Sequence, residues 1–395
     1  SERRFLHALN YCMLLPGPEA QQLVTYIGWL MHRSWGGIVA GGLFVLPSLL
    51  ILILLSWLYI AFGQTTLVAG LFYGIKPAVT AIVLQAAHRI GSRTLKNNVL
   101  MAIAAASFVA IFALNVPFPI IVLAAACVGL IGGRLAPNAF SASGGHTSTQ
   151  TSFGIALIDD DTPTPPHALF TWKRLMNVLL AGAVLWAVPM AFLVMQHGWD
   201  HTLTQMSCFF TKAALLTFGG AYAVLPYVYQ GAVEQFGWLT ATQMMDGLAL
   251  GETTPGPLIM VITFISFVSG WVNHALPNAS LWISGLTTAS VATFFTFLPS
   301  FVMIFLGAPF IETTRSQIKL AAPLTAITAA VVGVILNLAV FFALHTFWQE
   351  KTQQLNITGL VIASVAFIAL TKFKTNTLVV IIASGLTGLA LSYIA

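Results

Sequence analysis

Charged residues are scarce in this chain of 395 residues: 7% of the residues are Asp, Glu, Lys or Arg, whereas 58% are hydrophobic. A soluble domain carries about 25% charged residues, so this chain cannot cover itself with a surface that faces water. The lipid bilayer must therefore be the solvent for most of the folded surface. The sequence predicts an all-α polytopic membrane protein, with membrane lipids as its surroundings.

Cysteines and cofactor motifs are also few. The three cysteines, Cys12, Cys127 and Cys208, are scattered through apolar segments, and their spacing fits neither a disulfide framework nor a metal site. The absence of a Walker-type loop excludes an ATP-driven pump within this chain. The acidic run at 159–161 lies in a stretch rich in Gly and Pro, and we interpret it as solvated rather than metal-binding. No cofactor is predicted.

The net charge of +5 has a simple explanation that does not involve nucleic acid. The basic residues lie in short connections between apolar runs, where they mark the cytoplasmic side of a membrane protein. Crossing a bilayer takes about 20 apolar residues, and several runs reach or approach this length. The runs are 38–62, 67–87, 98–116, 118–134, 173–197, 281–308, 320–346, 357–371 and 376–395.

The chain contains an internal repeat. Three short words recur in the same order in both halves, and each copy holds four spans after its Pro-Gly-Pro word. An additional span between the copies reverses the second one, which predicts an inverted repeat, as in many secondary transporters. The matching words are Leu-Leu-Pro-Gly-Pro at 14–18 with Thr-Thr-Pro-Gly-Pro at 253–257, Leu-Pro-Ser at 46–48 with 298–300, and the words at 79–82 and 324–327.

This repeat divides the chain into four predicted parts. Residues 1–136 form the first transporter repeat and 201–395 the second, inverted one. Between them lie a flexible cytoplasmic linker at 137–172 and a connecting transmembrane helix at 173–200. The second copy also has a Phe-Gly-Gly element that the first copy begins too late to contain, so we expect the natural chain to extend further upstream.

The Pro-Gly-Pro words predict broken helices at membrane depth, because proline removes a hydrogen-bond donor and clashes with the preceding turn. Such breaks occur only where protein or a water-filled cavity satisfies the backbone. A helix that restarts after the break presents free N–H groups and the positive end of its dipole, which suits an anion. The alternative is a simple kink without a ligand. The predicted substrate-binding residues are Pro16, Gly17, Pro18, Gln21, Gln22, Lys212, Phe218, Gly219, Gly220, Thr253, Thr254, Pro255, Gly256 and Pro257.

Glu252 is the predicted coupling residue. It precedes two threonines at the second break, whereas Met13 takes its place in the first copy. Protonated, this carboxyl group could bind next to an anion and couple transport to protons. The alternative is a structural ion pair in which Lys212 holds Glu252 or Asp246. For Lys76, the other basic residue in an apolar run, we expect an outward-pointing side chain.

These words resemble the chromate ion transporter family, in its long two-domain form. The similarity rests on the stretch 14–23, on 36–48, on Thr217-Phe218-Gly219-Gly220 and the residues to Pro226, and on 251–258. It implies a duplicated efflux carrier in the inner membrane that exports chromate, driven by an ion gradient. Chromate and sulfate are both tetrahedral dianions, and the sequence leaves the choice between them open, as it does proton coupling, sulfate exchange and a homodimer.

An intramembrane enzyme acting on a lipid phosphate is the alternative of a different class. Helix ends that bind anions would suit such an enzyme as well. It would also need clustered acids for a metal, or a nucleophile beside a base. Neither is found in the apolar segments, so the sequence favours a transporter.

Overall fold

The structure is a computed structural model, and it describes residues 2–140, 158, 162–163, 165–218, 220–313, 321–349 and 354–394. These residues are almost entirely helical, which confirms the predicted all-α class. The α-helices are α1 (Glu2–Cys12), α2 (Glu19–Phe62), α3 (Thr66–Thr94), α4 (Asn98–Leu114), α5 (Phe118–Leu135), α6 (Trp172–His197), α7 (Thr202–Leu215), α8 (Ala221–Tyr229), α9 (Ala241–Thr253), α10 (Val261–Val272), α11 (Leu281–Thr313), α12 (Ala321–Phe347), α13 (Ile357–Thr371) and α14 (Thr377–Ile394).

Short elements fill some of the connections. They are the 3-10 turns η1 (Pro137–Ala139), η2 (Pro166–Ala168) and η4 (Leu258–Met260), the π-helical turn η3 (Gln230–Gln235), and the strands β1 (Trp348–Gln349) and β2 (Gln354–Leu355). The two strands pair antiparallel between α12 and α13. The linker region is described only in part, and its acidic run lies outside the described residues.

Each predicted apolar run coincides with one of the helices α2–α6 or α11–α14. Six helices in the described part of the chain are long and apolar enough to cross a membrane, namely α2, α3, α5, α6, α11 and α12. Their outward faces carry large apolar side chains, such as Leu135 and Met195, which are 80% and 85% exposed. An apolar outer surface of this kind is what a bilayer requires, so the protein is a multi-pass membrane protein.

Helix α2 folds back on itself near its start. His32 and Arg33 leave the helical conformation, with φ values of −133° and +57°. Eight residues along a straight helix span about 12 Å, yet a Cβ atom on Gly28 would lie 2.4 Å from the carbonyl oxygen of Gly36. The backbones of a short limb (19–31) and a long limb (34–62) therefore touch, and glycine at both positions permits this approach.

The second half forms a matching hairpin from α10 and α11. The turn between these helices covers 273–280. A Cβ atom on Gly270 of α10 would lie 2.0 Å from Oγ1 of Thr288 on α11, so these helices also pack closely. In both halves, a short helix after the Pro-Gly-Pro break thus leads into a long spanning helix.

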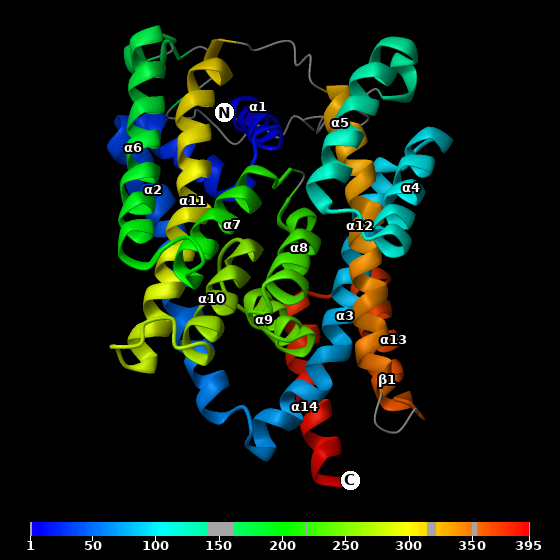
Figure 1. The fold of residues 1–395 in the computed structure, drawn as a ribbon. Helices are drawn as coiled ribbons and strands as arrows, with labels where there is room; N and C mark the ends of the chain where they lie inside the picture. The colour runs from blue at the N-terminus through cyan, green and yellow to red at the C-terminus, as the bar shows by residue number, and fades with distance from the viewer. Residues whose placement is uncertain are drawn as a thin grey trace.

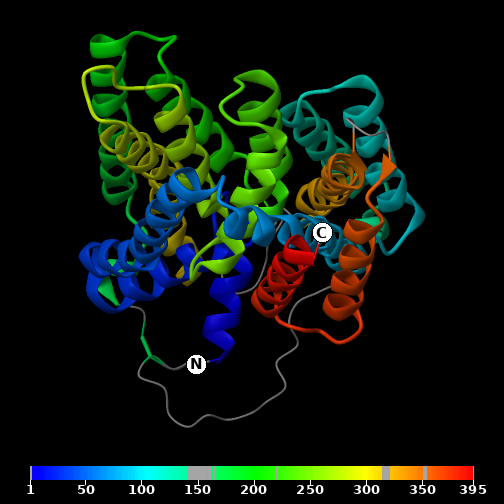
Figure 2. The same cartoon turned by 90° about the horizontal axis from the view of Figure 1, so that it is seen from below.

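The helices form two bundles, with α8 and α9 between them (Figures 1 and 2). One bundle holds α2, α6, α7, α10 and α11, and the other holds α3, α4, α5, α12, α13 and α14. Each bundle takes helices from both halves of the sequence. The largest apolar core gathers buried side chains of α8, α9 and α10 together with residues of α2, α3, α5 and α12. This core fixes α8 and α9 beside the two breaks.

Candidate functional site

Both Pro-Gly-Pro words interrupt helices, as the sequence predicts. The first break separates α1 from α2, and the second separates α9 from η4 and α10. The residues that precede the new helices, Pro18 and Pro257, form no capping hydrogen bond through a side chain. The first N–H groups of α2 and η4 are therefore left without a side-chain cap, at the positive ends of the helix dipoles.

Each break packs against a serine of the other half. Gly17 has φ +127°, and a Cβ atom there would lie 2.7 Å from Oγ of Ser300 on α11. Gly256 has φ +155°, and its Cβ atom would lie 2.8 Å from Cβ of Ser48 on α2. Both serines belong to the duplicated Leu-Pro-Ser word. In the sequence, the repeated Leu-Pro-Ser word served only as a sign of duplication. The same repetition could have marked its two serines as residues of the site.

Hydrogen bonds reinforce these reciprocal contacts. Oγ of Ser300 donates to Oε1 of Gln21 over 2.6 Å. Oγ of Ser48 donates to Oγ1 of Thr254 over 3.2 Å, since the hydroxyl proton of Thr254 is used on the carbonyl oxygen of Gly251. The residues flanking the two breaks are therefore tied to the middle of the opposite spanning helix.

The Phe-Gly-Gly segment of the second half reaches the first break. The N–H of Gly17 donates to the carbonyl oxygen of Thr217 over 2.9 Å. Gly220 has φ +100°, and its Cβ atom would lie 4.0 Å from Oε1 of Glu19. Phe218 is half-buried beside it, while Gly219 lies outside the described residues. Helix α8, which begins after Gly220 without a side-chain cap, also contacts η4, so three helix N-termini gather between the breaks.

The two glutamines at the first break are completely buried. Nε2 of Gln21 donates to Oγ1 of Thr25 over 3.0 Å, and Nε2 of Gln22 donates to the carbonyl oxygen of Pro16 over 2.7 Å. Within the described structure, Oε1 of Gln22 has no hydrogen-bond partner. Gln21 thus joins the break to α11, and Gln22 braces the break itself.

The threonines at the second break are half-buried, and their hydroxyl groups are occupied. Thr253 donates to the carbonyl oxygen of Leu250 over 2.8 Å, and Thr254 donates to that of Gly251 over 2.9 Å. Pro255 and Gly256 are exposed, whereas Gly17 and Pro18 are buried. The second break is therefore the more accessible of the two, and backbone N–H groups are its available donors.

Glu252 lies between α9 and α8. Its Oε1 accepts a hydrogen bond from the hydroxyl group of Tyr222, and Arg89 of α3 interacts electrostatically with both residues. Sequence reasoning did not select Tyr222 or Arg89, because α8 and α3 are distant from Glu252 along the chain. Glu252 is thus hydrogen-bonded to a tyrosine beside the second break.

The alternative in which Lys212 pairs with Glu252 or Asp246 is not what the structure shows. Lys212 is exposed on α7 and forms no ion pair among the described residues. Asp246 instead accepts a hydrogen bond from Tyr59 over 2.9 Å and lies 3.7 Å from Nζ of Lys76. Lys76 therefore points inward rather than outward. The tertiary fold brings α3 against α9, which the linear sequence does not show.

This arrangement predicts different effects for two lysine substitutions. Lys76→Gln should destabilise the protein by roughly 3 kcal/mol, because it leaves the buried Asp246 without its cation. Lys212→Gln should change stability by less than about 0.5 kcal/mol, as expected for an exposed side chain without a partner. Thermal unfolding of both variants in detergent measures the difference, and equal losses for the two would contradict the assignment of the pair.

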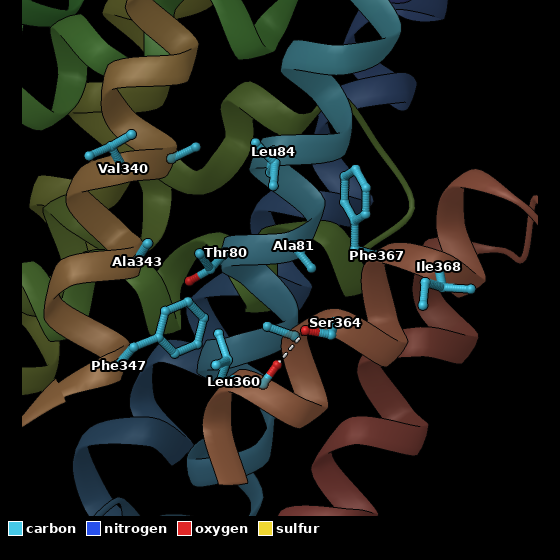
Figure 3. A pocket seen from close by; sticks show the side chains of 12 residues that line it. Thr80, Ala81, Leu84, Val340, Ala343, Phe347, Leu360, Ser364, Phe367 and Ile368 are labelled. Atoms are coloured by element: carbon cyan, nitrogen blue, oxygen red, sulfur yellow. Dashed lines mark hydrogen bonds between the residues drawn. The ribbon is translucent and has the colours of Figure 1, made fainter. Parts of the chain in front are cut away.

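A cavity of about 450 Å³ lies away from the breaks, between α3, α12 and α13 (Figure 3). Its lining is almost wholly apolar. Its two hydroxyl groups are engaged, since Ser364 donates to the carbonyl oxygen of Leu360 and Thr80 donates to that of Lys76. The cavity offers no donor set for a dianion, so it is not the candidate site.

Comparison with known proteins agrees with the motif resemblance. The model of the chromate transporter family matches residues 1–130 and 204–389. A chromate transport protein from Pseudomonas aeruginosa is 33% identical over 98% of this chain and 83% of its own length. A second, from Cupriavidus metallidurans, is 29% identical over 94% of this chain and 78% of its own length. No solved structure matches.

A shorter relative covers less of the chain. An uncharacterized transporter from Bacillus subtilis, YwrA, is 28% identical over 45% of this chain, which corresponds to 91% of its own length. These relatives are named as transporters and not as enzymes, which argues against the lipid-phosphate enzyme. The family match spans most of the described helices and both breaks. The chain belongs to the chromate transporter family.

Proposed function

We propose that this protein is a secondary active transporter that exports chromate across the inner membrane. The proposal draws on the family and on one observation: two uncapped helix N-termini follow the paired breaks, and each break is fastened to the opposite half. Helix N-termini bind anions through N–H groups and the positive dipole end. Transporters place such broken helices at the substrate site near the bilayer midplane.

The proposed site has donors but also two acids. The backbone N–H groups after Pro18 and Pro257 supply donors, and Ser48 can turn its hydroxyl proton from Oγ1 of Thr254 toward a ligand. Glu19 and Glu252 lie beside the helix ends, and their ionised forms would repel a dianion. Protonation of Glu252 removes one of these charges, which would link chromate binding to proton uptake.

We also propose that the two halves are an inverted repeat, with the part boundaries given by the sequence. The reciprocal contacts support this, since each Pro-Gly-Pro break meets the Leu-Pro-Ser serine of the other half. YwrA matches over 91% of its own length but covers only 45% of this chain. A duplicated chain would produce such a match.

The test is a flux measurement in inside-out membrane vesicles that contain the protein. Radiolabelled chromate and radiolabelled sulfate are supplied separately, with and without an imposed pH gradient. We expect chromate uptake that rises with the gradient and collapses with an uncoupler. Uptake of sulfate at the same rate would make the protein a general exporter of tetrahedral dianions, and no uptake of either would refute the proposed function.

A further inference from the structure

A buried ionic cluster lies at the end of α11. Glu312 is 2% exposed in its side chain, and its Oε2 accepts a hydrogen bond from Arg4 of α1 over 2.6 Å. Its Oε1 accepts a hydrogen bond from the hydroxyl group of Tyr26, on the short limb of α2. Arg4 also donates to the carbonyl oxygen of Thr162 in the linker. We name Arg4, Tyr26 and Glu312 the α11 cluster.

A second cluster lies towards the end of α2. Asp246 of α9 is 3% exposed in its side chain and accepts a hydrogen bond from Tyr59, on the long limb of α2. Lys76 of α3 completes the group at 3.7 Å, while the other carboxylate oxygen of Asp246 has no partner among the described residues. We name Tyr59, Lys76 and Asp246 the α2 cluster.

The two clusters have the same composition. Each consists of one acid from the second half and a tyrosine and a cation from the first half. Both acids are buried, and both accept a hydrogen bond from the tyrosine. Each cluster therefore fastens the first half of the chain to the second. Buried ions are expensive unless paired, so two such groups of like composition call for a functional explanation.

The clusters lie on opposite sides of the breaks. Glu312 is about 18 Å beyond Ser300 along α11, and Tyr59 is about 16 Å beyond Ser48 along α2, at 1.5 Å per residue. The serines contact the breaks, and the ends of α11 and α2 lie at opposite ends of the molecule (Figure 1). The proposed substrate site is thus flanked by one cluster in each direction.

We propose that the α11 cluster and the α2 cluster are the two gates of this transporter, which open alternately. This inference rests on the proposed function, because gates require a substrate path between them. An intact cluster holds the two halves together at its end of the molecule and closes that path. Both ion pairs are formed in the present conformation. Opening either end requires only that one ion pair separates, while the other keeps the opposite end shut.

The test measures access to the breaks from each side of the membrane. The reporter is Thr253→Cys beside the second break, in a protein whose three native cysteines are replaced by serine. An impermeant, negatively charged thiosulfonate labels it in spheroplasts from outside and in inverted vesicles from inside. Glu312→Gln should raise labelling from the side where α11 ends by about tenfold and lower it from the other side, as a shift between two states requires. Asp246→Asn should do the reverse.

The matched control is Asp200→Asn, an exposed acid in the connection between α6 and α7, which should leave labelling from both sides unchanged. Changes on the same side for Glu312→Gln and Asp246→Asn, or no change for either, would overturn the gates. Labelling does not depend on chromate, so it tests the gates separately from transport. If both variants change labelling as expected but the protein carries no chromate, the proposed function is refuted and not the gates.

Paired cysteines provide a second measurement in case a charge variant fails to reach the membrane. Arg4→Cys with Glu312→Cys, and separately Lys76→Cys with Asp246→Cys, should each stop radiolabelled chromate flux when a bifunctional thiosulfonate joins the two thiols across the space of the former side chains. Cleavage of this bridge with dithiothreitol should restore the flux to its value before cross-linking. Flux that continues at full rate through a cross-linked pair would refute that cluster as a gate.

Discussion

Leucine in place of Gly17 or Gly256 should reduce chromate flux by roughly 100-fold, the loss that a displacement of about 1 Å causes in a preorganised site. Both glycines have positive φ values, which cost other residues about 1–2 kcal/mol. A side chain at Gly17 would also collide with Nε2 of Gln22 and Oγ of Ser300, both 2.7 Å from its Cβ atom. The break would move away from α11, and the helix N-terminus would lose its position.

The matched control is Gly42→Leu, in the long limb of α2. A Cβ atom at Gly42 would meet nothing within 4 Å, so this variant adds the same side chain to the helix that follows the first break without a collision. Flux in vesicles should stay close to that of the unaltered protein, with equal amounts of all variants in the membrane. Full flux in Gly17→Leu and Gly256→Leu would show that the breaks are only kinks.

Glu252→Gln should abolish the pH dependence of flux, which is the second large effect. The substitution keeps the shape of the side chain and removes its ability to carry a proton. It preserves an acceptor for the hydroxyl group of Tyr222, so α8 and α9 stay joined. Because the neutral amide mimics the protonated acid, substrate binding should persist. Flux measured on both sides of neutral pH reports the loss of coupling.

Tyr222→Phe separates coupling from packing. It removes the hydrogen bond to Glu252 but leaves the carboxyl group in place, so pH-dependent flux should remain. If the vesicle assay detects sulfate flux, that flux reports the pH dependence of the protein alone, since sulfate stays a dianion where chromate itself takes up a proton. A fully pH-dependent Glu252→Gln would exclude Glu252 as the coupling residue, and the buried acid Asp246 would be the next candidate.

The proposed gates and the proposed site describe one transport cycle. The α11 cluster lies at the end where the sequence predicts the cytoplasm, because the basic residues of the linker and of 315–319 belong to that side. Opening it would admit chromate to the breaks. Closing it and opening the α2 cluster would release chromate outside. Thr162, which accepts a hydrogen bond from Arg4, connects the linker to the first of these steps.

Local composition was enough to predict the helices. Each of the nine apolar runs overlaps a helix in the described part of the chain, and both Pro-Gly-Pro words end one helix and precede another. These features depend on neighbours in the chain: a long apolar run must be helical in lipid, and proline cannot continue a helix. The hairpin inside α2 was less visible, because the turn at His32 and Arg33 has no proline or glycine of its own.

Pairing between distant side chains was beyond the sequence. Lys212 was predicted to bind substrate, with a pair to Glu252 or Asp246 as the alternative, yet its side chain is exposed on α7. Lys76, which belongs to the other half, reaches Asp246. The sequence contained the charged residues of both clusters but gave no sign that they form two groups of like composition.

The sequence by itself determined the membrane class, the spans, the two breaks and the family, because each follows from local composition or from words of adjacent residues. Only the tertiary structure decided which residues meet at the breaks. The crossing of α2 with α11 places Ser48 and Ser300 on the opposite breaks, and the packing of α3 on α9 joins Lys76 to Asp246. Such contacts depend on how whole helices pack against one another, and no single segment of sequence encodes that packing.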